Sequence, residues 1–445
     1  MLASLLLLTL LSSTLIANRP APTVVEQPAP LLLSSKAKQH SKIKMIMLHI
    51  GENESVANIA KMIHFDLEFS DQMAINLKKT AMLPNAKQAA ALGKQAYTLL
   101  LTLEEKNKKK KAIEVEITLK DPVTNDSFFS KKYLCSEHNI IQQGHTIADE
   151  LMPTLTGESG PMLSTLAYCK QLSNNHKVIC IADYACRLEK PVVTAKTINI
   201  APAWHTKAPG LCYSQFTRTN SRLMFVDLPT RKHNIVCSYD GLNMQPSFSP
   251  DGAQAALCLS SKGNSEIYLY DQAICKAAGK RFFKQLTNNK GNNVSPCLLE
   301  SGDLVFCSDF QTGSPQIYRK HAATGKVELL TNGKGYCASP HYNPTTKQLV
   351  YTRYANGAFQ LWSMDISQQH PIEKQLTFNA GDKLEPSWSA CGKYVAFTYT
   401  KYDNNLKKRM SQIAVLNTQS SNIRILTTSP EQKSFPSWTG RNLYA

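Results

Sequence analysis

Residues 246–252 read Pro-Ser-Phe-Ser-Pro-Asp-Gly, and residues 386–392 repeat this segment as Pro-Ser-Trp-Ser-Ala-Cys-Gly. Shorter versions, Pro-Ala-Trp and Pro-Ser-Trp, occur at residues 202–204 and 436–438. Four times a segment ending in Leu-Thr precedes such a proline by nine residues, as Thr287 to Pro296, Thr331 to Pro340, Thr377 to Pro386 and Thr427 to Pro436. Prolines 202, 246, 296, 340, 386 and 436 are 44, 50, 44, 46 and 50 residues apart. A strand-rich repeat with a period near 45 residues is typical of β-propeller blades.

Each repeat contains four strand-like segments, which is the content of one blade. The opening proline is compatible with a strand because it stands at the strand's start. Five units are complete, whereas the unit that opens at Pro436 contains one strand only. Its missing strands are expected at residues 165–169, 177–183 and 191–194. We therefore predict an all-β six-bladed propeller over residues 153–445, closed by the C-terminal strand so that no sheet edge stays exposed.

The segment at residues 41–152 alternates between strand and helix patterns and predicts a small α/β domain. Isoleucine, valine and leucine alternate with polar residues over 113–119, as in a half-buried strand. A helical pattern over 138–152 is expected to end before Pro153, and the lysine-rich run at 106–111 is expected to be a hairpin loop. The predicted order is βαβαβββα or close to it.

The first 40 residues have two compositions. Residues 1–17 form an apolar segment of signal-peptide length, too short for a comfortable membrane span. This segment has no basic start, so either the true start is upstream or the anchor stays uncleaved. Residues 18–40 are proline-rich and predict a flexible leader. The expected product is an exported protein, located in the periplasm, with no direct transmembrane insertion after signal cleavage.

Charge and cysteine content leave two questions open. The chain has a net charge of +17, and residues 153–445 carry 32 Lys/Arg against 18 Asp/Glu, a net +14. This excess either attracts anionic partners or reflects a generally basic composition. The twelve cysteines include no CxxC pair, and several lie in apolar strand-like segments. Buried thiols are favoured over a disulfide framework.

The sequence contains no pattern that supports catalysis. There is no GxSxG nucleophile elbow, no P-loop, no HExxH and no EF-hand loop. Cysteine and histidine do not recur at zinc-ligand spacing. We therefore expect no catalytic residues, no cofactor, no metal and no nucleic acid, and we interpret the chain as a protein-binding module rather than an enzyme.

Several segments resemble the TolB family of the Tol–Pal system. They are residues 144–151 (Gly-His-Thr-Ile-Ala-Asp-Glu-Leu), 155–157 (Leu-Thr-Gly), 165–168 (Thr-Leu-Ala-Tyr) and 67–71 (Leu-Glu-Phe-Ser-Asp). The resemblance implies a periplasmic, non-enzymatic adaptor that binds the peptidoglycan-associated lipoprotein Pal at one mouth of the propeller. It also implies contact with TolA through the N-terminal leader, and a role in outer-membrane integrity and in envelope invagination during cell division.

By the same resemblance, the Pal-binding residues are expected in loops just before the opening prolines. The candidates are Leu242, Asn243, Met244, Gln245, Asn292, Asn293, Val294, Ser295, Tyr336, Lys383 and Glu385. Rigid blades that present preorganised loops would lower the cost of ordering on association. Two other functions remain open at this point: the propeller module of a peptidase assembly, and a receptor for an anionic envelope polymer.

Overall fold

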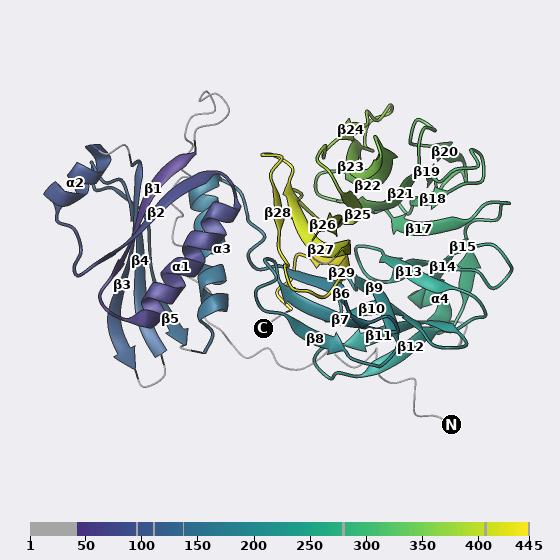
Figure 1. Cartoon of the computed structure of the whole chain (residues 1–445), viewed down its shortest axis with the longest axis horizontal. Coiled ribbons are helices and arrows are strands. Elements are labelled where there is room, and N and C mark those ends of the chain that lie inside the picture. Colours follow the sequence, from purple (N-terminus) through teal and green to yellow (C-terminus); the bar gives the residue numbers. More distant parts are fainter. Residues whose placement is uncertain are drawn as a thin grey trace.

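The computed structural model describes residues 42–94, 97–109, 112–136, 138–277, 281–404 and 407–443. The chain forms an α/β domain, at the left of Figure 1, and a β-propeller at the right. The predicted signal segment (1–17), the whole of the predicted leader (18–40) and residue 41 lie outside the described residues.

The α/β domain has the predicted order βαβαβββα. Its elements are β1 (Ile43–Ile50), α1 (Glu54–Phe69), β2 (Met73–Thr80), α2 (Ala86–Lys94), β3 (Leu99–Lys109), β4 (Ala112–Lys120), β5 (Ser127–Ser136) and α3 (Ile140–Thr156). The sheet order is β2-β1-β3-β4-β5, in which β1 is parallel to both neighbours. Strand β4 alternates between buried and half-buried residues, and its buried side chains face α1 and α3. Helix α2 packs on the other face through Ala89.

Two local predictions in this domain are wrong. Residues 106–109 of the lysine-rich run are not a loop, because β3 continues through Lys109, which pairs with Ala112 of β4, whereas residues 110–111 lie outside the described residues. Helix α3 does not end before Pro153 but continues to Thr156. The proline removes one helical N–H, and this is tolerated near the end of the helix. The helix ends at Gly157, which has a positive φ of 75° and donates its N–H to the Pro153 carbonyl.

The propeller is built from six four-stranded blades in the described residues. Its elements are β6 (Thr165–Ser173), β7 (His176–Asp183), β8 (Lys190–Val193), β9 (Ile198–Trp204), β10 (Gly210–Phe216), β11 (Ser221–Asp227), β12 (His233–Cys237), β13 (Asn243–Phe248), β14 (Gln254–Leu259), β15 (Glu266–Asp271), α4 (Gln272–Ala277), β16 (Phe283–Gln285), β17 (Asn293–Leu298), β18 (Leu304–Ser308), β19 (Gln316–Lys320), β20 (Val327–Leu329), β21 (Cys337–Tyr342), β22 (Gln348–Ala355), β23 (Ala358–Asp365), β24 (Lys374–Gln375), β25 (Asp382–Trp388), β26 (Tyr394–Asp403), β27 (Lys408–Asn417), β28 (Ile423–Ile425) and β29 (Lys433–Thr439). Five blades are the consecutive quartets β9–β12, β13–β16, β17–β20, β21–β24 and β25–β28.

The sixth blade is closed by the C-terminus, which confirms the sequence prediction. Strand β29 pairs antiparallel with β6, from Lys433 opposite Lys170 to Thr439 opposite Thr165. Strands β7 and β8 complete this blade. Beyond β29, the guanidinium of Arg441 donates hydrogen bonds to backbone carbonyls in the turn at residues 205–208 of the next blade. The last residues therefore hold two blades together.

The Leu-Thr repeat has a structural cause that recurs in four blades. In the blade β21–β24, Thr377 Oγ1 accepts from the Leu361 backbone N–H at 2.9 Å and donates to Gln360 Oε1 at 2.7 Å. The Gln360 amide then donates to the Asn379 carbonyl in the loop that leads to the next blade. The same pair of threonine contacts joins Thr287 to Glu266 and Ile267, Thr331 to Gln316 and Ile317, and Thr427 to Gln412 and Ile413.

The residue before each opening proline is a second repeated feature. Its φ lies between 51° and 55° in all six blades, at Ala201, Gln245, Ser295, Ser339, Glu385 and Phe435. These left-handed residues coincide with register shifts in the innermost strands, as between Met244 and Ser247. Each innermost strand therefore carries a bulge beside its proline, and such bulges re-aim the neighbouring side chains.

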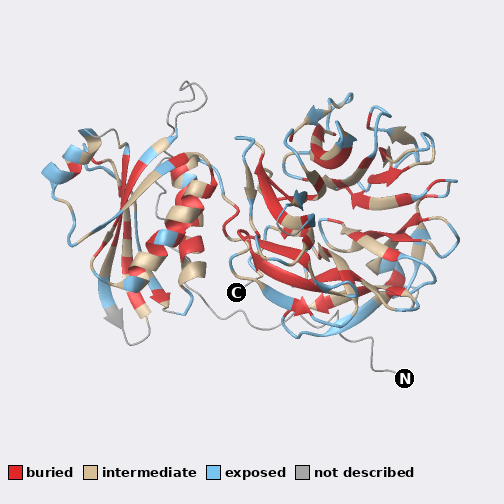
Figure 2. Ribbon diagram, in the orientation of Figure 1, coloured by how far each residue is buried: buried red, intermediate tan, exposed pale blue. Residues whose placement is uncertain are grey.

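The hydrophobic core is continuous between the two domains. One buried cluster contains residues of α1, α3 and β4 together with Tyr184, Tyr394 and Trp438 of the propeller. Figure 2 shows buried residues along the facing helices and the inner strands, and exposed residues on the outer strands and loops. The two domains consequently share packing as well as polar contacts.

Candidate partner-binding site

The mouth of the propeller is defined here as the end at which the innermost strand of each blade begins. Because the four strands of a blade alternate in direction, two kinds of connection meet at this end. They are the loops that lead from one blade to the next and the hairpins between the second and third strands. All of the predicted partner-binding residues lie at the mouth, but most are in β13, β17 and β25 rather than in loops.

Three of the predicted residues have side chains that are fully buried. Asn243, Asn293 and Lys383 are each 0% exposed and stand three residues before their prolines. The Lys383 ammonium donates to the carbonyls of Asn379, Ala380 and Gly381. The Asn243 and Asn293 amides donate to loop groups at the corresponding positions of their blades. These side chains shape the mouth loops from within.

Two further candidates join neighbouring blades. Gln245 Oε1 accepts from the Ser295 backbone N–H at 3.0 Å, and Glu385 Oε2 accepts from the Phe435 backbone N–H at 2.8 Å. Burial raises the pKa of Glu385, although hydrogen bonds from Thr398 and Phe435 oppose this effect. Both side chains contribute to the alignment of adjacent innermost strands at the mouth.

Leu242, Asn292 and Tyr336 are exposed, whereas Met244 and Val294 are half-buried. Leu242 and Tyr336 are part of a larger set of apolar side chains at the mouth, which we call the apolar rim. Its members are each between 38% and 77% exposed: Leu172, Tyr239, Leu242, Tyr336, Tyr354, Phe378 and Tyr402.

Sequence reasoning found two residues of the apolar rim and missed the other five. Leu172, Tyr354 and Tyr402 lie at the hairpin ends of β6, β22 and β26, where each aromatic or leucine follows an otherwise buried strand pattern. Tyr336 and Tyr354 both pack edge-on against Phe359, at ring-centroid distances of 5.7 and 5.2 Å. An aromatic residue just before a predicted hairpin turn is the sequence feature that could have indicated Tyr354 and Tyr402.

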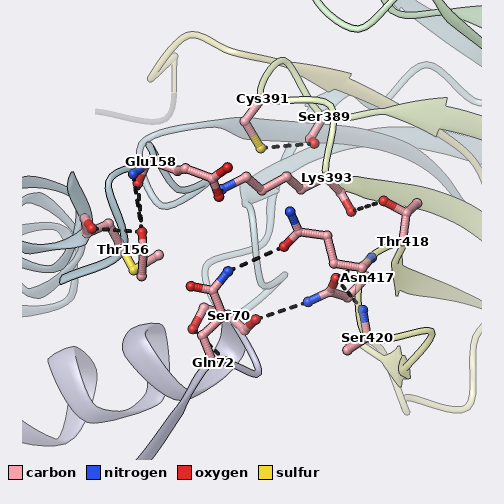
Figure 3. Close-up of polar contacts among 12 residues, drawn as sticks. Ser70, Gln72, Thr156, Glu158, Ser389, Cys391, Lys393, Asn417, Thr418 and Ser420 are labelled. Carbon is pink, nitrogen blue, oxygen red and sulfur yellow. Dashed lines mark hydrogen bonds and ion pairs between the residues drawn. The ribbon is translucent and has the colours of Figure 1, made fainter. Parts of the chain in front are cut away.

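The α/β domain contacts the opposite end of the propeller, and Figure 3 shows polar contacts of this junction in close-up. Asn417 donates to the Ser70 carbonyl at 3.1 Å, and Lys393 pairs with Glu158. Lys393 lies in the turn between β25 and β26, and Ser420, which donates to Asp71 Oδ2, lies in the connection between β27 and β28. Both connections are at the end remote from the mouth, so the apolar rim is not covered by the α/β domain.

The described residues contain no group of three or more His, Cys, Asp or Glu arranged to hold a metal ion. All twelve cysteines are free thiols, ten of them buried. Within the ranges that the structure describes, no helix combines the length and the apolar character needed to span a bilayer.

An α/β domain at one end of a six-bladed propeller, with an apolar rim at the other, defines a two-domain protein of the β-propeller class. The chain belongs to the TolB family, since the family described as TolB beta propeller domain matches residues 152–442. The family resemblance drawn from the sequence is thereby confirmed. The matched relatives are named Tol-Pal system protein TolB, in agreement with the expectation that the chain is not an enzyme.

Two curated relatives and one solved structure illustrate the similarity. The Tol-Pal system protein TolB of Francisella tularensis subsp. mediasiatica (strain FSC147) is 26% identical over 266 residues, which are 58% of this chain and 59% of that protein. The Tol-Pal system protein TolB of Helicobacter pylori (strain ATCC 700392 / 26695) is 26% identical over 246 residues, 53% of this chain and 56% of that protein. The crystal structure of TolB from Acinetobacter baumannii has the same fold, with a TM-score of 0.76 and 24% identity over 90% of this chain and 97% of that chain.

Proposed function

We propose that the protein is a periplasmic adaptor that binds the peptidoglycan-associated lipoprotein Pal at the mouth of its propeller. In this role it supports outer-membrane integrity and envelope invagination during cell division. The observation that carries the proposal is the apolar rim at the end of the propeller that the α/β domain leaves free.

The geometry of the rim suits a protein partner of ordinary interface size. Leu172, Tyr354 and Tyr402 are attached to hydrogen-bonded strands, and the loops that carry the other rim residues are held by buried side chains such as Asn243 and Lys383, so that little ordering is needed on association. Aromatic side chains such as Tyr336, Tyr354 and Phe378 are the kind that dominates binding energy at interfaces. A stable complex buries about 800 Å² on each partner, and a rim that extends over several blades offers a surface of this order.

The N-terminal leader is proposed to contact TolA. Residues 18–40 are proline-rich. They would form the N-terminal end of the protein once the signal segment at 1–17 is removed on export. The described chain begins at Lys42, directly before β1, so the leader is attached to the α/β domain. Separate attachment points would allow one partner at the leader and another at the mouth.

The test compares two exposed apolar residues in one blade. Phe378, in the apolar rim, is 77% exposed, and Ile372, which precedes β24 at the remote end, is 85% exposed. Phe378→Glu should reduce recovery of Pal after envelope crosslinking at least tenfold, because a buried carboxylate at the interface costs several kcal/mol. Ile372→Glu should leave recovery unchanged. Equal recovery with both variants would overturn the assignment of the mouth.

The net charge of +14 on residues 153–445 favours a second function, a receptor for an anionic envelope polymer. Such binding would weaken strongly between about 50 and 200 mM salt, because exposed charges are screened. It would also survive Phe378→Glu. If a separate hydrolase chain were recovered in place of Pal, a peptidase assembly would be the correct interpretation.

A further inference from the structure

A histidine lies between two carboxylates at the junction of the domains. His145 of α3 is 4% exposed, and its Nδ1 lies 2.8 Å from Asp66 Oδ2 of α1. Its Nε2 lies 3.3 Å from Oδ2 of Asp183, at the end of β7 in the propeller. The hydroxyl of Tyr184 donates to Asp66 Oδ1 at 2.6 Å. These four residues, which we call the His145 cluster, form a closed ring of contacts from α1 and α3 to two consecutive propeller residues.

The geometry of the cluster requires one more proton than a neutral histidine supplies. A neutral imidazole has one N–H, so it can donate to Asp66 or to Asp183 but not to both. Without a further proton, His145 Nε2 and Asp183 Oδ2 would face each other as two acceptors, and both atoms are buried without a hydrogen-bond partner among the described residues. An unpaired buried carboxylate oxygen is costly. A second proton on the imidazole removes this conflict, because both ring nitrogens then donate.

We propose that His145 is a proton-dependent clasp: the proton that it shares with Asp66 and Asp183 holds the α/β domain against the propeller, and its loss loosens this junction. The clasp is independent of the partner at the mouth. The contacts of Asp71 with Arg424 and of Glu158 with Lys393 remain when the proton is lost, so the domains stay associated while the packing around α1 and α3 relaxes.

Of the ionisable groups around the histidine, Asp183 and Asp66 favour its charged form. Asp149 of α3 is a third nearby carboxyl, which interacts electrostatically with Asp66, and burial raises the pKa of Asp149. Arg187 of the propeller is directed away, over the Phe65 ring at 3.6 Å. Burial lowers the pKa of His145, but the hydrogen bonds and charges of Asp183 and Asp66 outweigh burial and raise it to about 9.

The direction of the pH effect follows from this raised pKa. A histidine in an unfolded chain has a pKa of about 6.5. The stabilisation is therefore complete below pH 6.5 and disappears as the pH rises through about 9. Loosening is expected on the alkaline side of neutrality. His145 and Asp183 line a small cavity together with Gln142, Ser164 and Asn442.

The experiment uses the full chain labelled with ¹⁵N-histidine. His321 is a matched control, because its Nδ1 and Nε2 also face two carboxylates, Asp303 at 3.5 Å and Glu328 at 3.1 Å, but within one blade of the propeller. The variants His145→Gln and His321→Gln identify the two signals. We expect the His145 imidazole to be protonated at pH 7.5 and to titrate near pH 9. A neutral His145 at pH 7.5 would overturn the proposal.

A second measurement needs no variant, in case His145→Gln does not fold. Amide hydrogen exchange of the wild-type chain, corrected for the intrinsic dependence on pH, should show a loss of protection at the end of α1 and at residues 183–188. Between pH 7 and pH 10 this loss should be about one to two orders of magnitude, with no matching loss around His321. Unchanged protection at the junction, or an equal loss throughout the propeller, would contradict the clasp.

Discussion

Arg424 and Asp71 form an ion pair across the junction of the two domains. The Arg424 guanidinium donates to Asp71 Oδ1 at 2.6 Å and lies 5.0 Å from the centre of the Phe69 ring. Asp71 has a φ of 62° and directly follows the helix end at Ser70, so the pair fixes the chain where α1 turns into β2. A charge-assisted hydrogen bond and a ring contact thus attach the first helix to the last complete blade.

Removing this pair should destabilise the junction. Arg424→Met leaves the 6% exposed Asp71 carboxylate with fewer donors, and we expect a loss of about 1–3 kcal/mol in the free energy of unfolding. The control is Arg409→Met, since Arg409 pairs with Asp382 but is 61% exposed, and exposed pairs contribute about 0–1 kcal/mol. Urea unfolding measures the free energy of unfolding of both variants. Equal losses would contradict the prediction that the Arg424–Asp71 pair stabilises the protein more than an exposed ion pair does.

The same carboxylate predicts an acid limit for the junction. Burial opposes ionisation of Asp71, but hydrogen bonds from Ser420 and Arg424 outweigh it and lower the pKa of Asp71 below its usual value. Its contribution is therefore present above about pH 4 and lost as the pH falls through the lowered pKa. Between pH 6 and pH 3, the melting temperature of the wild type should fall more steeply than that of Asp71→Asn. Parallel curves would exclude the Asp71 carboxylate as the cause of the acid destabilisation.

The repeated threonine predicts a stability effect within a blade. Thr377→Val has nearly the same shape but leaves the Leu361 N–H and the Gln360 side-chain oxygen without their partner. We expect a loss of about 2–3 kcal/mol, the cost of unsatisfied buried groups. Thr377→Ser should retain most of the stability. Exposed Thr324 supplies the control, because Thr324→Val should change stability by less than about 0.5 kcal/mol.

The fold could be predicted because its repeated residues have the same physical role in each blade. Thr377 pairs with Gln360 as Thr331 pairs with Gln316, so one hydrogen-bonding requirement produces a visible period in the sequence. Closure was predictable for a related reason: the unit at Pro436 lacks three strands, and the missing ones lie upstream.

The site could be predicted only in part, because side-chain direction depends on features that a period does not encode. Regular alternation does not reveal that Lys383 points inward, since Glu385 lies in a left-handed bulge that disturbs the register. Exposure at a hairpin end, as at Tyr354, depends on how far two strands continue before they turn. The junction joins residues far apart in the chain, such as Asp66 and Asp183, which no local pattern relates.

The C-terminal strand predicts a sharp limit to truncation. Removing residues 434–445 deletes most of β29 and leaves β6 without a partner on its inner side. It also removes Trp438, whose indole N–H donates to Ser164 at 2.6 Å, and Arg441. We expect no stable propeller, because an open ring exposes strand edges. A soluble truncated protein that melts cooperatively would show that closure by β29 is dispensable. Arg441→Leu, which keeps β29, should fold with a lower melting temperature.

The buried lysine at the mouth connects stability to partner binding. The Lys383 ammonium holds the carbonyls of Ala380 and Gly381 at 3.1 and 2.8 Å, in the loop that carries the exposed Phe378. Lys383→Met keeps the length of the side chain but removes these donors, so the loop should become mobile and Pal should bind several-fold more weakly. Lys374→Met is the control, because Lys374 lies on the exposed outer strand β24. Calorimetric titration with purified Pal measures the change in binding, and hydrogen-exchange rates of the amides at 378–381 measure the change in loop mobility. Weaker binding without faster exchange would mean that Lys383 acts in some other way than by holding the loop.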